Sequence, residues 1–266
     1  MRLLILTAAL ALSGTAAAQQ LAPEALTELP ATEIVILGEV HDNPAHHAAQ
    51  SRVLASLQPR AVIWEMLTPD QAARLPADLS DRETVAEATN WSESGWPDFA
   101  MYHPLMLATP DALHLGAGIS RDQARRVFET PLAEVFGPDA ALFGLDQPLP
   151  EPEQAAREAG MMAAHCDALP AHLLPGMVAA QRLRDGTLAR AALAALEQVG
   201  PPVAVITGNG HARTDWGVPA LLAQAAPGVT VLSLGQLEAP PEGDPPFDLW
   251  LVTDPPERDD PCAAFR

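Results

Sequence analysis

The sequence contains no lysine; all 15 of its basic residues are arginine. A chain without lysine cannot form a lysine Schiff base, hold pyridoxal phosphate through one, or complete the lysine-containing P-loop of nucleotide-binding proteins. The basic residues are outnumbered by 34 acidic ones, which gives a formal net charge of −19. Nucleic acids and anionic membrane surfaces are both bound largely through positive charge, so neither is expected as a partner.

Cysteine and tyrosine are also scarce. The two cysteines, Cys166 and Cys262, do not form a C-x-x-C pair, which excludes a zinc or redox site built on such a motif. Export from the cytoplasm would permit a disulfide between them, but their spacing alone leaves its formation open. Tyr102 is the only tyrosine, so any ligand that requires a phenolate oxygen has one candidate in the whole chain.

Apolar stretches long enough to suggest a targeting signal occur only at the start of the chain. Arg2 precedes an apolar run over residues 3–12, and small residues follow it up to Ala18. This pattern predicts a secretory signal peptide over residues 1–18, cleaved before Gln19. The run is too short for a membrane span, and no cysteine stands beside the cleavage site to carry a lipid. We therefore expect the mature chain to be periplasmic or secreted, without stable membrane insertion.

The richest polar motif, residues 38–50, directly follows an apolar and β-branched run at 33–37. The run predicts a buried strand, and the Asn-Pro pair at 43–44 favours the start of a helix that extends to about residue 58. Ligands of open α/β sheets bind outside the carboxyl ends of strands. The motif places a cluster of acids and imidazoles at such an end: Glu39, His41, Asp42, His46 and His47.

The alternation of apolar runs with helical stretches predicts an α/β fold. The run at 61–66 follows the first helix and forms a β-α-β unit with the run at 33–37, which predicts that these two strands pair in parallel. We expect a mostly parallel sheet of about five or six strands, flanked by helices, with a helical insertion between 153 and 199, in one domain over residues 19–266. The further strands are predicted at 114–119, 202–207, 229–234 and 248–252, whereas 141–146 reads as either a strand or a loop.

A second motif, Gly208-Asn209-Gly210-His211-Ala212-Arg213, follows the strand predicted at 202–207. Its glycines allow the backbone to approach a ligand closely. The motif is too short for the G-x-G-x-x-G fingerprint of dinucleotide-binding folds, since Arg213 occupies the last position. It therefore excludes that fingerprint and places His211 at the same edge of the sheet as the first motif.

Together, the two motifs resemble the ChaN-like haem-binding uptake family, within the Tiki superfamily. Residues 64–66, 95–102 and 180–185 are similar to that family as well, in the same order. The chain differs in lacking the lipid-bearing cysteine of many relatives, and in having Leu188-Ala189 where relatives often have Met-Ala. The resemblance implies an α/β fold, haem as the ligand and a role in haem-iron uptake outside the cytoplasm. Its implied partners are a second copy of the chain or an outer-membrane haem receptor.

Haem iron takes histidine or tyrosine as an axial ligand, and aromatic side chains suit the porphyrin face. Tyr102 has an alternative as an ordinary core tyrosine, and Arg213 has one as an ion-pair partner of a buried acid. The residues considered for haem binding are Tyr102, His41, His46, His47, His211, Arg213 and Trp96.

The superfamily also includes metal-dependent peptidases and esterases, among them the erythromycin-esterase type. Glu39, His41, Glu65 and His211 would suit Zn, Mn or Fe, or general acid–base hydrolysis. The competing structural interpretations are a histidine bonded to a carbonyl and carboxylates that cap helices or pair with Arg213. Because two buried carboxylates need compensation, we expect a cation-sized gap or a contact with Arg213 between Glu39 and Glu65.

Overall fold

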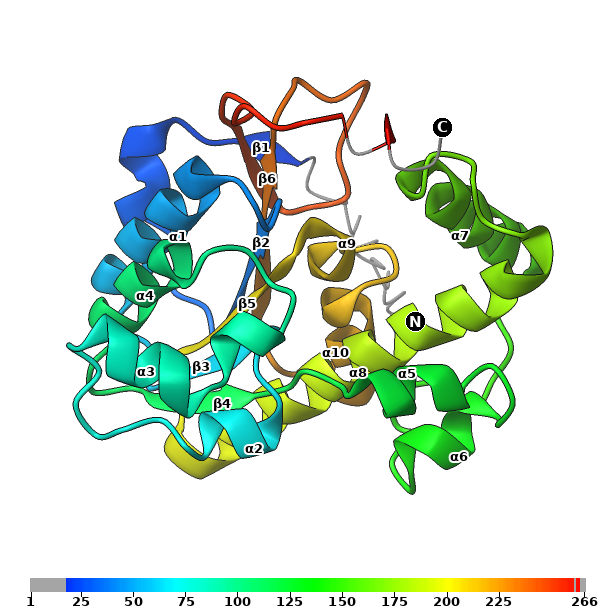
Figure 1. The fold of residues 1–266 in the computed structure, drawn as a ribbon, viewed down its shortest axis with the longest axis horizontal. Coiled ribbons are helices and arrows are strands. Elements are labelled where there is room, and N and C mark those ends of the chain that lie inside the picture. Colours follow the sequence, from blue (N-terminus) through cyan, green and yellow to red (C-terminus); the bar gives the residue numbers. More distant parts are fainter. Residues whose placement is uncertain (1–17, 261, 264–266) are drawn as a thin grey trace, which may run out of the picture.

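The computed structural model describes residues 18–260, 262 and 263, and its centre is a parallel sheet (Figure 1). The predicted signal peptide therefore lies, except for its last residue, outside the described residues. Within the described part the sheet has seven strands in the order β1-β7-β6-β2-β5-β3-β4, and every neighbouring pair is parallel. The strands are β1 (Gln19–Gln20), β2 (Ile34–Glu39), β3 (Ala61–Trp64), β4 (Leu113–Gly116), β5 (Val203–Gly208), β6 (Val231–Leu237) and β7 (Leu249–Val252).

Helices cover both faces of the sheet, because successive side chains of a strand point to opposite faces. Along β2, Val35 and Leu37 pack on the same side as α1 and α4, whereas Ile34 and Ile36 pack on the side of α8 and α10. Figure 1 shows these two helix layers on either side of the strands. The helices are α1 (Pro44–Leu57), α2 (Pro69–Ala72), α3 (Arg82–Ala88), α4 (Phe99–Leu107), α5 (Arg121–Arg126), α6 (Leu132–Phe136), α7 (Glu151–Ala164), α8 (Leu174–Val199), α9 (Asn209–Ala212) and α10 (Val218–Ala225), with 3-10 turns at Pro23–Thr27, Trp91–Glu93 and Ala171–Leu173.

The predicted α/β class and parallel sheet are confirmed, with three corrections of detail. The strands β2 and β3 are parallel but do not pair, because β5 lies between them and bonds to both. Seven strands are present in the described part where about five or six were expected, and residues 141–146 form turns. Helix α8 is no separate insertion, since it buries Leu188 and Ala192 in the core, whereas α7 has no buried residue.

The strand order explains why the two motifs meet. Glu39, the last residue of β2, is in register with Gly208, the last residue of β5. Glu65 directly follows β3, whose residue Trp64 is in register with Ile206 of β5. The carboxyl ends of three adjacent strands therefore present their polar residues at one edge of the sheet.

Candidate functional site

Glu39 is the centre of the first half of the site. Its side chain is fully buried, and its Oε1 atom accepts hydrogen bonds from His41 Nδ1 at 2.8 Å and from the Tyr102 hydroxyl at 3.0 Å. The tyrosine is held there by α4, whose N-cap Asp98 accepts a bond from the backbone N–H of Ala100. Both donors are directed at one carboxylate oxygen, which fixes the position of Glu39 and orients the ring of His41.

Glu65 organises the second half. Its Oε2 atom accepts hydrogen bonds from the Thr207 hydroxyl at 2.7 Å and from the Gly208 backbone N–H at 2.8 Å. Its Oε1 atom lies 3.4 Å from His211 Nε2. Burial alone would raise the pKa of Glu65, but the adjacent His211 and these hydrogen bonds lower it below the ordinary range, so the group is a carboxylate.

His211 bridges two buried carboxylates. Its Nδ1 atom lies 2.6 Å from Asp185 Oδ1 of helix α8, and its Nε2 atom faces Glu65. Burial would lower the pKa of His211, but the charges of Glu65 and Asp185 raise it to about 10. Both ring nitrogens therefore carry protons at neutral pH, and the imidazolium compensates the buried acids.

His41 is the one histidine of the strand-end cluster that reaches solvent, with 32% of its side chain exposed. Its ring meets Trp96 edge to face at a centroid distance of 4.8 Å. Gly208 leaves room for it, since a Cβ there would lie 2.8 Å from His41 Nε2. Burial lowers the pKa of His41, but the bond to Glu39 and the charge of Glu65 raise it overall. The Nε2 atom has no hydrogen-bond partner among the described residues.

His46 and His47 are both buried beneath the turn that follows β2. His46 Nδ1 accepts a bond from the Val40 backbone N–H at 2.9 Å, and His47 Nε2 donates to the His41 carbonyl at 2.8 Å. Burial lowers the pKa of His46 to about 4, so its ring is neutral. These two histidines support the turn and do not line the cavity, so the structure does not agree with their prediction as haem-binding residues.

A cavity of about 840 Å³ opens in front of these strand ends. One wall consists of the strand-end residues, including His41, Glu65 and His211, together with Trp96. The opposite wall comes from α5, α7 and α8 and the loop after α5. Three members of that wall, Ala180, Gln181 and Arg184, fall in the segment 180–185 that resembles the family. The sequence motifs did not indicate the others, which are Ala124, Arg125, Phe128, Met161, Ala164, His165 and Met177.

Two predicted residues lie outside this cavity. The Tyr102 side chain is fully buried behind Glu39, and burial together with the Glu39 charge raises its pKa above the ordinary value, which disfavours a phenolate. Tyr102 is therefore badly placed as an axial ligand. Arg213 pairs with Asp215 at 2.6 Å and stacks on Trp216 at 3.8 Å. Of the two arrangements expected between Glu39 and Glu65, a cation-sized gap or a contact with Arg213, the contact is not formed, because Arg213 pairs with Asp215, two residues away along the chain.

The four residues considered as metal ligands do lie together, as two separate hydrogen-bonded or ion-paired couples. His41 bonds to Glu39, and His211 faces Glu65. Across residues 18–260, 262 and 263, no three histidine, cysteine or acidic side chains converge in a way that could hold a metal ion. The partners that compensate the buried charges of Glu39 and Glu65 are therefore His41 and His211.

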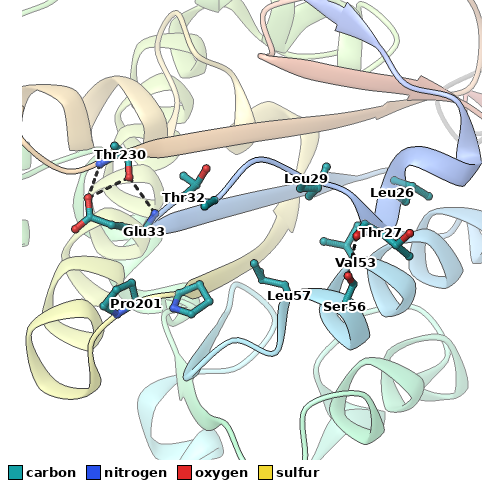
Figure 2. Close-up of a pocket in the computed structure, with 12 residues that line it drawn as sticks. Leu26, Thr27, Leu29, Thr32, Glu33, Val53, Ser56, Leu57, Pro201 and Thr230 are labelled. Atoms are coloured by element: carbon teal, nitrogen blue, oxygen red, sulfur yellow. Dashed lines mark hydrogen bonds between the residues drawn. The ribbon is translucent and has the colours of Figure 1, made fainter.

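A second groove, of about 500 Å³, lies at the amino ends of β2, β5 and β6 (Figure 2). Its walls are mainly apolar, with Leu26, Val53 and Leu57 along one side. Its single acid, Glu33, accepts bonds from the backbone and hydroxyl of Thr230. Among the residues that line this groove no histidine occurs, so the strand-end cavity is the stronger candidate for chemistry.

Comparisons with known proteins agree with this geometry. A comparison with curated proteins found no match. The structure of ChaN of Campylobacter jejuni, which binds haem cofacially, is similar with a TM-score of 0.65 and 17% identity, over 85% of this chain and 89% of that one. A Bacillus cereus protein gives a TM-score of 0.34 at 11% identity, over 80% of this chain and 67% of its own. The family model described as haem-binding uptake, Tiki superfamily, ChaN matches residues 25–222, most of the described part. The chain belongs to the ChaN family of haem-binding uptake proteins within the Tiki superfamily.

Proposed function

We propose that this chain is an exported haem-binding protein that takes part in haem-iron uptake or handling. The observation that carries the proposal is the strand-end cavity, which combines three features that haem requires. Trp96, Phe128 and the two methionines provide apolar and polarisable surface for a porphyrin. Arg125 and Arg184 provide charge for its propionates.

The third feature is a nitrogen donor for iron. Within the described lining, His41 and His165 have Nε2 atoms without a hydrogen-bond partner, and each ring is oriented through its Nδ1 atom. The volume of about 840 Å³ falls in the range of sites for cofactor-sized ligands. The residues present therefore fit haem, which supplies the iron centre when bound.

Export is supported by the disulfide between Cys166 and Cys262, whose sulfur atoms are bonded in the structure. Such bonds persist mainly in oxidising compartments such as the periplasm. Among the residues that the structure describes, no helix combines the length and apolar character that crossing a bilayer demands. We infer a periplasmic or secreted protein, with a second copy of the chain or an outer-membrane haem receptor as its protein partner.

The cavity assignment is tested by filling the space. Ala163 and Ala164 are both exposed on α7, but only Ala164 lines the cavity. We expect saturable haem binding, followed by the Soret band, in wild type and in Ala163→Trp, and at least about tenfold weaker binding in Ala164→Trp, because an indole displaces the porphyrin. No saturable Soret shift in wild type would reject the proposed function, and equal affinities for the two variants would reject this cavity.

A second candidate is hydrolysis, favoured by the Glu39–His41 pair, whose free Nε2 atom borders the cavity. A histidine oriented by a buried carboxylate is suited to act as a general base. Under this alternative, purified protein would cleave members of an ester or peptide panel, and His41→Ala and Glu39→Gln would each lower the rate by about 10²-fold or more. Metal analysis of protein purified without chelator, together with unaffected haem binding in both variants, would separate the two activities.

A further inference from the structure

The imidazole of His165 lies on the wall of the cavity opposite the strand ends, at the C-terminal end of α7. Its Nδ1 atom donates to the Met161 carbonyl at 2.8 Å. A carbonyl oxygen can only accept a hydrogen bond, so this contact keeps the proton of the neutral ring on Nδ1. The lone pair of Nε2 is then available for a ligand in the cavity.

The other donors of the cavity are less suited to bind iron. Both nitrogens of His211 face carboxylates, Asp185 and Glu65, and carry protons. The Nε2 atom of His41 lies over Gly208 among the buried acids. The bond to Glu39 and the charge of Glu65 raise the pKa of His41, so a proton competes with iron for its Nε2 lone pair more strongly than at an unperturbed imidazole.

His165 differs in its surroundings. The cavity wall around it carries Met161, Ala164, Phe128 and Met177, and among the described residues no acid is hydrogen-bonded or ion-paired to its ring. Phe128 is 44% exposed and lines the cavity, so its ring offers apolar surface to a ligand there. An apolar wall with one oriented nitrogen matches what an axially bound porphyrin needs.

We propose that His165 Nε2 is the axial ligand of haem iron in this chain, an assignment that rests on the proposed haem-binding function. The Nε2 lone pair forms the bond to ferric iron, and a water coordinated to that iron leaves. The proton remains on Nδ1, hydrogen-bonded to the Met161 carbonyl. The ligand thus comes from the segment after α7 and not from the only tyrosine, whose hydroxyl is committed to Glu39.

The test compares His165→Ala with His172→Ala, since His172 is an exposed histidine of the same helical region that does not line the cavity. Ferric haem is titrated into each purified protein and followed by the Soret band and by electron paramagnetic resonance. We expect His172→Ala to match wild type and Tyr102→Phe to keep the spectral signature of a nitrogen ligand. We expect His165→Ala to bind at least about tenfold more weakly, to lose the signature of a nitrogen ligand and to regain it with added imidazole.

His165→Asn retains a polar side chain at the end of α7 and is expected to show the same loss. If the His165 variants keep wild-type spectra while His41→Ala or Tyr102→Phe loses them, the ligand assignment is overturned although haem binding stands. If wild type shows no saturable binding, the proposed function itself fails, and the assignment fails with it.

Discussion

Replacing Glu65 with glutamine is expected to lower the free energy of unfolding by about 3 kcal/mol. The carboxylate is buried, accepts bonds from Thr207 and Gly208, and faces His211 at 3.4 Å. Glutamine keeps an acceptor oxygen for the first two contacts but removes the charge that compensates the imidazolium. The loss falls at the low end of values for broken buried pairs, because Asp185 remains beside His211.

The same variant has a pH signature. The pKa of His211 is about 10 in the folded chain against an ordinary value of 6.5. Stability from this group is therefore fully present below pH 6.5 and is lost as the pH rises to about 10, by at most about 1.4 kcal/mol per pH unit. His41, whose pKa is also raised, contributes with the same sign. We expect this decline to flatten in Glu65→Gln, because the variant lowers the pKa of both histidines.

Urea unfolding followed by tryptophan fluorescence between about pH 7 and 9.5 measures both effects. The chain has no lysine and no free cysteine to titrate in that window, and the raised pKa of Tyr102 keeps the folded tyrosine out of it. Glu153→Gln is the matched control, because this partly exposed acid of α7 pairs with Arg157 and should contribute below about 1 kcal/mol. Equal losses in the two variants, or parallel pH curves for wild type and Glu65→Gln, would contradict the assigned role of Glu65.

The sequence predicted the strand-end half of the site because that half is encoded locally. An apolar run ends, and a glutamate or a glycine-rich turn follows it directly, so Glu39, Glu65 and His211 could be placed at one edge. The order of the strands carries no such local signal. The separation of β2 from β3 by β5 depends on pairing between residues more than a hundred positions apart, which the β-α-β pattern does not contain.

The helical half of the site could be predicted only in part. The sequence does contain an indication for Asp185. It lies three residues before Leu188 and four before Ala189, and so falls on the buried stripe of α8. An unpaired acid is costly at such a position, so a partner for Asp185 is expected. The sequence contains no such indication for His165. Helix α7 has no buried residue, and the direction of His165 toward the cavity is set by tertiary packing. Arg213 was misjudged because a local acid, Asp215, competes with the distant ones.

Replacing both Cys166 and Cys262 with serine is expected to lower the free energy of unfolding by about 2–4 kcal/mol. The disulfide joins residues 96 positions apart, so it removes much of the freedom that the unfolded chain would otherwise have. A reductant should destabilise wild type to the same extent and should leave the double variant unchanged, because the chain has no other cysteine.

The bond also concerns the cavity, since Cys166 directly follows His165. Helix α7 is held mainly by its contact with α8 and buries no side chain of its own, so the disulfide is a principal restraint on the segment that carries His165. We therefore expect the double variant, in protein that is still folded, to bind ferric haem several-fold more weakly than wild type, because the ligand must be ordered on binding. Titration of thiols in unfolded, unreduced protein provides the check on the bond itself. Two reactive thiols in the unfolded, unreduced wild type, or a free energy of unfolding that a reductant leaves unchanged, would remove the basis of this prediction.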